Sequence, residues 1–135
     1  AVDGLVGTLR ARVSLLDRVH DATVTLDPPP PELPPLSGPA EETLLRVAEE
    51  ALHNALRHAG ATAVRVSLTA AADQTVTLVV TDDGVGFDVD APRPAAARRL
   101  GLASMRERAR VAGGTLRVSS ATGQGTTVRL AVPGG

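Results

Sequence analysis

Glu50, Asn54 and His58 recur at intervals of four within a mostly apolar segment that runs from residue 40 to residue 59. In a helix, this spacing stacks the three side chains in one row along the border of the apolar side. A carboxylate and an amide at such a border could hold a hydrated cation or orient a reacting group. A solvated helix edge with ordinary i,i+4 pairing has the same spacing, so the row alone leaves both readings open.

Asp82 ends an alternating segment whose apolar members share one face: Val76, Leu78 and Val80. The alternation predicts that the Asp82 carboxylate points toward the core, where a charged group needs hydrogen-bond donors. The sequence Asp83-Gly84-Val85-Gly86 follows at once. Asp-Gly is a common turn signal, but two glycines also let the backbone turn sharply and approach a ligand closely. The segment therefore predicts a binding loop next to an inward carboxylate.

Two later segments carry further candidate groups. Gly101 opens a helical pattern, and the free N–H groups at such a helix start suit a phosphate. Thr126 follows Gly123-Gln124-Gly125 and shares an inward face with three apolar residues, Val128, Leu130 and Val132. If the strands of Asp82 and Thr126 are neighbours, the carboxylate and the hydroxyl could lie close together. Such a pair is a sensible way to read the amino group of adenine.

The elements that must position these groups are marked by changes of hydrophobic period and by glycine and proline. We expect helices at residues 4–19, 40–59 and 102–112, and strands at residues 22–27, 64–69, 75–82, 115–120 and 126–132. Residues 62–82 are predicted to form a hairpin, and residues 83–100 a loop. Residues 28–39 are proline-rich and predict an extended connector, because proline cannot stand inside a helix.

This order of elements predicts an α+β fold, a two-layer sandwich of a hairpin-rich sheet and helices. The strands alternate instead of being apolar throughout, so the helices should cover one face of the sheet only. A length of 135 residues fits one domain.

The composition excludes several classes of function. The chain has no cysteine, which excludes disulfides and thiolate metal sites and is compatible with a reducing, cytoplasmic compartment. A net charge of −1 and a single aromatic residue, Phe87, give no basis for nucleic-acid binding. No apolar run is long enough to span a bilayer and no segment resembles a signal peptide, so we expect no direct membrane contact.

Four segments together, in this order, resemble the nucleotide-binding domain shared by gyrase, the Hsp90 chaperones, MutL and histidine kinases, the GHKL or Bergerat fold. They are EEALHNALRHA as the N box, DDGVGFD and LGLASMRERA as the first two glycine boxes, and GQGTTV as the last. The resemblance covers residues 40–133 well and residues 1–27 less closely. The segment ASMRERARVAGGTLRVSS resembles NarX/DesK-like sensor kinases. The fold implied is a mixed, mostly antiparallel sheet with helices on one face.

The resemblance implies roles for the N box. Asn54 would supply an oxygen to Mg²⁺, which bridges the phosphates of ATP. Glu50 matches the acidic position that polarises a nucleophile or supports the water shell of the metal. Arg57 and His58 match the basic end of the box and would contact phosphate.

The glycine boxes would form the rest of the ATP site. Asp82 would accept from the adenine amino group, Gly84 and Gly86 would line the base pocket, and Thr126 would lie near the base. Gly101 and Leu102 would form the turn on the phosphate side, and residues 87–100 would be the ATP lid. Family members usually carry a further glycine where this chain has Arg99, and Arg98 and Arg99 could meet phosphates instead.

The function implied is that of the ATP-binding catalytic domain of a two-component sensor histidine kinase, which binds Mg-ATP and donates the γ-phosphate to a histidine on a separate domain. His20 and His53 read as surface or packing histidines, so residues 1–27 would lead in from an upstream dimerisation and phosphoacceptor region. The implied partners are ATP or ADP, that upstream domain and a response regulator. The alternatives are a serine kinase of the anti-sigma-factor type and a non-catalytic nucleotide-binding regulatory module.

Overall fold

A computed structural model describes residues 2–86 and 101–134 of the chain. Its helices and strands are α1 (Val2–Val19), β1 (Thr23–Leu26), α2 (Gly38–His53) with a π-helical continuation (Asn54–His58), β2 (Ala63–Ala70), β3 (Val76–Asp82), α4 (Leu102–Val111), β4 (Thr115–Ser120) and β5 (Thr126–Val132). Apart from the last turn of the helix expected at residues 40–59, the expected elements are confirmed, with ends that differ by one or two residues. The predicted loop at residues 83–100 is described only as far as residue 86.

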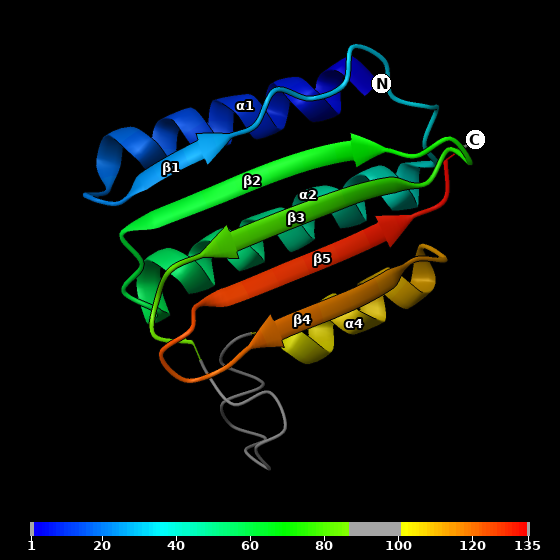
Figure 1. Ribbon diagram of the computed structural model, residues 1–135. Helices are drawn as coiled ribbons and strands as arrows, with labels where there is room; N and C mark the ends of the chain where they lie inside the picture. Colours follow the sequence, from blue (N-terminus) through cyan, green and yellow to red (C-terminus); the bar gives the residue numbers. More distant parts are fainter. Residues whose placement is uncertain (1, 87–100, 135) are drawn as a thin grey trace.

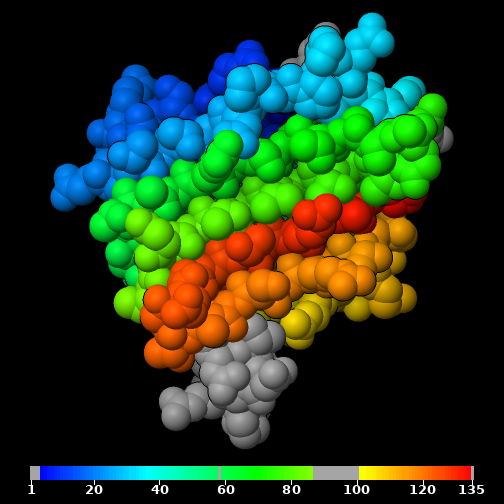
Figure 2. Space-filling view, in the orientation of Figure 1, coloured from blue at the N-terminus to red at the C-terminus, as the bar shows by residue number. Residues whose placement is uncertain are grey.

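The five strands form one sheet in the order β1-β2-β3-β5-β4. Strand β1 runs parallel to β2, and the other three pairs are antiparallel, so the sheet is mixed. Helices α2 and α4 lie behind the sheet in Figure 1, and α1 lies beside β1 at one edge. Figure 2 shows the opposite face, where no helix covers β2, β3, β5 or β4. The predicted two-layer sandwich with one covered face is confirmed.

The core lies between the inner face of the sheet and the helices. Its largest fully buried side chains are aliphatic, apart from one methionine: Leu5, Leu44, Leu52, Leu68, Leu78, Met105, Leu130, Val47, Val64, Val66, Val76 and Val80. Every second residue is buried along β3 and along β2 from Val64 to Leu68, as alternation requires when one face is covered.

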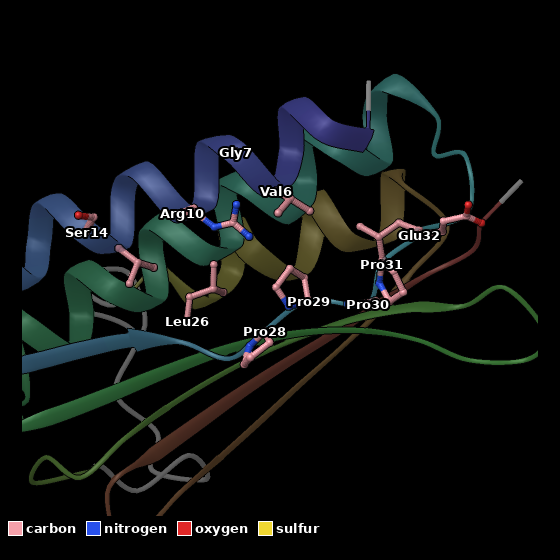
Figure 3. Close-up of a pocket in the computed structure, with 12 residues that line it drawn as sticks. Val6, Gly7, Arg10, Ser14, Leu26, Pro28, Pro29, Pro30, Pro31 and Glu32 are labelled. Atoms are coloured by element: carbon pink, nitrogen blue, oxygen red, sulfur yellow. The ribbon is translucent and has the colours of Figure 1, made fainter.

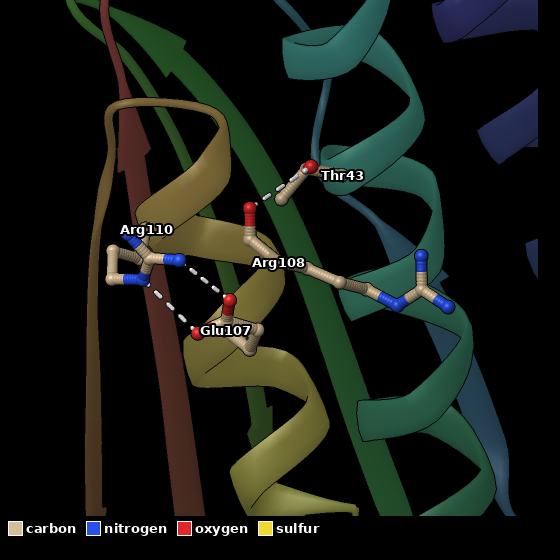
Figure 4. A network of polar contacts seen from close by, with 4 residues as sticks. All are labelled: Thr43, Glu107, Arg108 and Arg110. Atoms are coloured by element: carbon tan, nitrogen blue, oxygen red, sulfur yellow. Dashed lines mark hydrogen bonds and ion pairs between the residues drawn. The ribbon is translucent and has the colours of Figure 1, made fainter.

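Helix α2 carries Glu50 and leads into the π-helical turn that begins with Asn54. It begins at Gly38, two residues earlier than expected, because the hydroxyl of Ser37 caps it and accepts from the Ala40 N–H (3.1 Å). Pro39 stands in the first turn, where its missing N–H has no helical partner to lose. Helices α2 and α4 are joined by a hydrogen bond in which the Thr43 hydroxyl of α2 donates to the Arg108 carbonyl of α4 at 3.4 Å (Figure 4).

The expected single α-helix over residues 40–59 is wrong in its last turn, which is π-helical. There the Ala59 N–H reaches the Asn54 carbonyl, five residues back, at 3.0 Å. A π turn holds more residues than an α turn, so spacing by four no longer defines a row beyond Asn54. Of the predicted row of three, the α-helical spacing by four therefore applies to Glu50 and Asn54.

The proline-rich connector runs back along α1, as Figure 3 shows. Leu33 of the connector is buried in the core. A groove of about 970 Å³ lies between α1 and the connector and is lined in part by Val6, Arg10, Leu26 and Pro28.

Candidate functional site

One transverse row of the sheet carries the polar residues of the site. The register pairs Asp82 with Val64 on one side and with Thr126 on the other, and Thr126 is paired in turn with Ser120. The strands β3 and β5 are therefore neighbours, as the proposed pairing of Asp82 and Thr126 requires. Because residues opposite each other in a sheet point to the same face, both side chains lie on the covered side.

Asp82 is buried, with 8% of its surface exposed. Burial raises the pKa of its carboxyl group, hydrogen bonds from the backbone N–H groups of Gly84 and Thr126 oppose that effect, and the neighbouring charge of Asp83 adds to it. The Gly84 N–H donates to Oδ1 at 2.8 Å. The prediction of an inward carboxylate is confirmed. A carboxylate has about four acceptor positions, so two backbone donors leave room for a ligand donor.

Asp83 points away from that site and joins two strands. Its carboxylate accepts from the backbone N–H groups of Thr62 (2.8 Å) and Ala63 (2.9 Å) and from the Thr62 hydroxyl (2.5 Å). These bonds, led by the one from the Thr62 hydroxyl, lower the pKa of Asp83. The two adjacent carboxylates therefore differ in their contacts. Asp83 fixes the end of β3 to the start of β2, whereas Asp82 is held facing inward.

Thr126 has a hydroxyl partner that the sequence reasoning missed. Its Oγ1 lies 2.8 Å from Oγ of Ser120, and the Ser120 hydroxyl also donates to the Gly125 carbonyl at 3.0 Å. Both side chains are half-buried. The only sequence signal for Ser120 is its position at the end of a strand, three residues before Gly123.

The glycines of the site allow close backbone contacts around Asp82. A Cβ on Gly84 would lie 2.5 Å from Cβ of Ala59, at the end of the π-helical turn. A Cβ on Gly125, whose φ is +76°, would overlap the Asp82 carbonyl oxygen. Gly86 has φ of +68° and lies against Ala121 and Gly125 in the same way. These approaches bring loops 83–86 and 121–125 together, with loop 83–86 packed against the end of the π-helical turn.

Gly101, predicted to lie on the phosphate side, meets Glu50 where α2 passes the start of α4. Gly101 precedes α4 with φ of +71°, and a Cβ there would overlap Oε1 of Glu50. Glu50 and Asn54 are both half-buried. Leu102 is 6% exposed and belongs to the core, so it could meet a phosphate only through its backbone. The first N–H groups of α4 have no intrahelical acceptors and suit an anion.

Glu50 and Asn54 also fit the donor set that Mg²⁺ prefers. A carboxylate and an amide present hard oxygen atoms, and Mg²⁺ is usually held by one or two such protein groups together with water and phosphate oxygens. The Asn54 side-chain oxygen is buried and accepts no hydrogen bond from the part of the chain that the structure describes, although the residue makes other contacts.

The remaining candidate residues are two in the π-helical turn, two further histidines, and those in the expected lid. Arg57 is exposed on the π-helical turn, and for His58 the structure describes the backbone only. His53 is exposed and His20 is half-buried. Arg98, Arg99 and the expected lid at residues 87–100 lie outside the described residues.

Comparisons with known proteins relate the chain to histidine kinases. Residues 40–135 match the family described as histidine kinase-, DNA gyrase B-, and HSP90-like ATPase. The sensor histidine kinase LnrJ of Bacillus subtilis is 42% identical over 98 residues, which cover 73% of this chain and 22% of that protein. The nitrate/nitrite sensor protein NarQ of Escherichia coli is 36% identical over 126 residues, 93% of this chain and 22% of that protein.

The crystal structure of the ATP binding domain of PrrB from Mycobacterium tuberculosis has a similar fold, with a TM-score of 0.68 and 27% sequence identity. That similarity covers 91% of this chain and 88% of the PrrB chain. In contrast, the present chain spans only about a fifth of the curated relatives named above. None of the helices in residues 2–86 and 101–134 has the length and apolar character needed to cross a membrane.

Proposed function

The chain belongs to the histidine kinase-, DNA gyrase B- and HSP90-like ATPases, and on this premise we propose that it is the catalytic domain of a sensor histidine kinase. In this role it binds Mg-ATP and presents the γ-phosphate to a histidine on another domain. The observation that carries the proposal is a buried carboxylate, Asp82, at the end of a strand whose next turn packs, through Gly84, against the end of the π-helical turn. On the same helix pair, Glu50 of α2 lies against Gly101 at the start of α4.

The base end of the proposed site is the row that contains Asp82 and Thr126. The backbone amides of Gly84 and Thr126 hold the Asp82 carboxylate, which accepts from the adenine amino group. Thr126 supplies a second oxygen beside it. Gly84 and Gly86 shape the loop that lines the base. The cost of burying the carboxylate is offset when a ligand donates to it.

The phosphate end is formed by α2 and the start of α4. The N–H groups that follow Gly101 and Leu102 bind phosphate oxygens, and Arg57 and His58 add positive charge at the basic end of the N box. Glu50 and Asn54 hold Mg²⁺ and its water shell, or Glu50 polarises the attacking histidine. When bound, Mg²⁺ neutralises charge on the phosphates.

Phosphoryl transfer depends mainly on positioning and charge neutralisation, so the domain needs little covalent chemistry of its own. The acceptor histidine would belong to a dimerisation and phosphoacceptor domain of the parent protein, which would pass the phosphoryl group to a response regulator. We place this activity in the cytoplasm, where ATP is available. The support for these partners is that the relatives are sensor kinases several times longer than this chain.

Calorimetric titration with Mg-ADP tests the proposal. The wild-type domain should bind, and Asp82→Asn should bind at least about tenfold more weakly, because its amide can turn a donor toward the adenine amine. Asp73→Asn is the matched control: Asp73 is exposed in the turn at the far end of the same hairpin. Phosphorylation of an added phosphoacceptor domain from [γ-³²P]ATP tests the kinase activity.

Absence of Mg-ADP binding by the folded wild-type domain would refute the proposal. Equal affinity of the wild type and Asp82→Asn would refute the assignment of the base site. Transfer to an anti-sigma antagonist, but not to a histidine-containing phosphoacceptor domain, would favour the serine kinase alternative.

A further inference from the structure

The hydroxyl groups of Ser120 and Thr126 form a hydrogen-bonded pair at the ends of β4 and β5. Ser120 Oγ lies 3.0 Å from the Gly125 carbonyl oxygen and 2.8 Å from Thr126 Oγ1. Thr126 is also the cross-strand neighbour of Asp82, so this pair borders the carboxylate of the base site.

Counting protons gives the direction of each bond. A hydroxyl group has one proton to donate, and a carbonyl oxygen can only accept. The bond to Gly125 therefore uses the Ser120 proton. The geometry of the contact between the two hydroxyls allows either direction, and with the Ser120 proton given to Gly125 the donor in that contact is Thr126. In that arrangement the Thr126 proton serves Ser120, and the Thr126 oxygen is left as an acceptor.

The side of the site formed by Asp82 and Thr126 consequently offers oxygen acceptors to a base. A purine with an amino group at position 6 brings a donor to them. A purine with a carbonyl at that position would bring oxygen against oxygen, with no proton between them, and burial makes such an unmatched contact unfavourable.

We propose that Ser120 is a positioning residue that fixes the Thr126 hydroxyl as an acceptor and so makes the site select adenine over guanine nucleotides. This inference rests on the proposed function, because it assumes that Asp82 and Thr126 bind the nucleobase. Without the Ser120 oxygen, the Thr126 proton turns toward the carboxylate of its cross-strand neighbour and competes there with the adenine amine.

The test is the ratio of Mg-ADP to Mg-GDP affinity, measured by calorimetry on the whole domain. Ser120→Ala should lower this ratio about tenfold, the worth of one buried hydrogen bond of good geometry. Ser119→Ala is the matched control, since Ser119 is the next residue on the same strand and is exposed on the other face. It should leave the ratio unchanged.

A second pair of variants separates positioning from a merely structural role in the turn. In a Thr126→Val background the hydroxyl to be positioned is absent, so Ser120→Ala should cause little further change in the ratio. Ser120→Cys keeps the shape of the side chain but has a weak acceptor, and should give an intermediate ratio. It also serves if Ser120→Ala does not fold.

The outcomes distinguish this inference from the proposed function. If the wild type prefers ADP and both Ser120→Ala and Ser120→Cys keep that preference, Ser120 does not set it, and the kinase proposal stands. An equal fall in the ratio with and without the Thr126 hydroxyl would show a structural effect and overturn the inference. A folded wild type that binds neither nucleotide would remove the proposed function, and the inference with it.

Discussion

Gly101 offers a sharp test of the contact between α2 and the start of α4. Its φ is +71°, and a Cβ added there would overlap Oε1 of Glu50 and lie 2.7 Å from Cδ and 2.9 Å from Cγ of the same side chain. Gly101→Ala therefore imposes two penalties. The alanine must adopt a left-handed backbone conformation, and the Glu50 side chain must move away from the helix start.

The first penalty can be measured separately at Gly60. Gly60 has φ of +60°, and a Cβ added there would meet nothing within 4 Å. A left-handed conformation costs an ordinary L-residue about 1–2 kcal/mol. For a domain of this size, about 1 kcal/mol corresponds to a shift in Tm of roughly 3–5 °C. Gly60→Ala should thus lower the Tm by this backbone cost alone, and Gly101→Ala by at least as much.

The two variants should differ in function. Thermal unfolding followed by circular dichroism gives the Tm, and calorimetry gives the affinity for Mg-ADP. Gly60→Ala should bind Mg-ADP as the wild type does, whereas Gly101→Ala should bind at least about tenfold more weakly, because Glu50 and the phosphate turn are displaced.

A double-mutant cycle assigns the second penalty to Glu50. In a Glu50→Ala background the side chain that a new Cβ would meet is shorter, so Gly101→Ala should cost only the backbone term in stability. Unchanged Mg-ADP affinity in Gly101→Ala, together with a Tm equal to that of Gly60→Ala, would refute the contact between Gly101 and Glu50.

Three further predictions concern charge. Asn54→Ala should weaken Mg-ADP binding more than binding of metal-free ADP, and an equal loss in titrations with and without Mg²⁺ would exclude Asn54 as a metal ligand. Burial raises the pKa of Asp82, so its contribution to stability is lost as the pH rises through that pKa, and Asp82→Asn should gain more in Tm at pH 7 than at pH 4 without nucleotide. An equal difference at both pH values would contradict this. Hydrogen bonds from Thr62 and Ala63 lower the pKa of Asp83, so its contribution is present above the unfolded pKa of about 3.9 and is lost below it. Asp83→Asn should therefore lose less Tm than the wild type between pH 6 and pH 3; the same loss would show that these bonds do not favour the folded state.

The sequence was enough to predict that Asp82 and Thr126, the residues proposed to bind the base, face inward. Alternation along residues 76–82 predicts an inward Asp82, and alternation along residues 126–132 predicts an inward Thr126. Both predictions depend only on the side-chain period of a strand, which is fixed by backbone geometry. That the two residues face each other depends on strand order, which a single sequence leaves open.

The parts that could not be predicted depend on contacts between distant segments. An α-helix and a π-helical turn carry similar apolar patterns, so nothing in residues 54–58 distinguishes them. The contact of Glu50 with Gly101 joins residues about fifty positions apart in the chain. Ser120 was missed because its partner is known only once the register of β4 and β5 is fixed.

The site row lies at the ends of three strands, and this has a consequence for how the chain can change in length. Asp82 and Thr126 form the last pair of their ladder, and Ser120 pairs with Thr126 at the end of its own. Adding or deleting one residue within any of these strands would turn that strand's polar residue to the opposite face and remove it from the row. The turn around Ala71–Thr75 lies at the other end of the hairpin, as Figure 1 shows. Loop insertions, affinity tags or reporter peptides placed there should leave nucleotide binding intact.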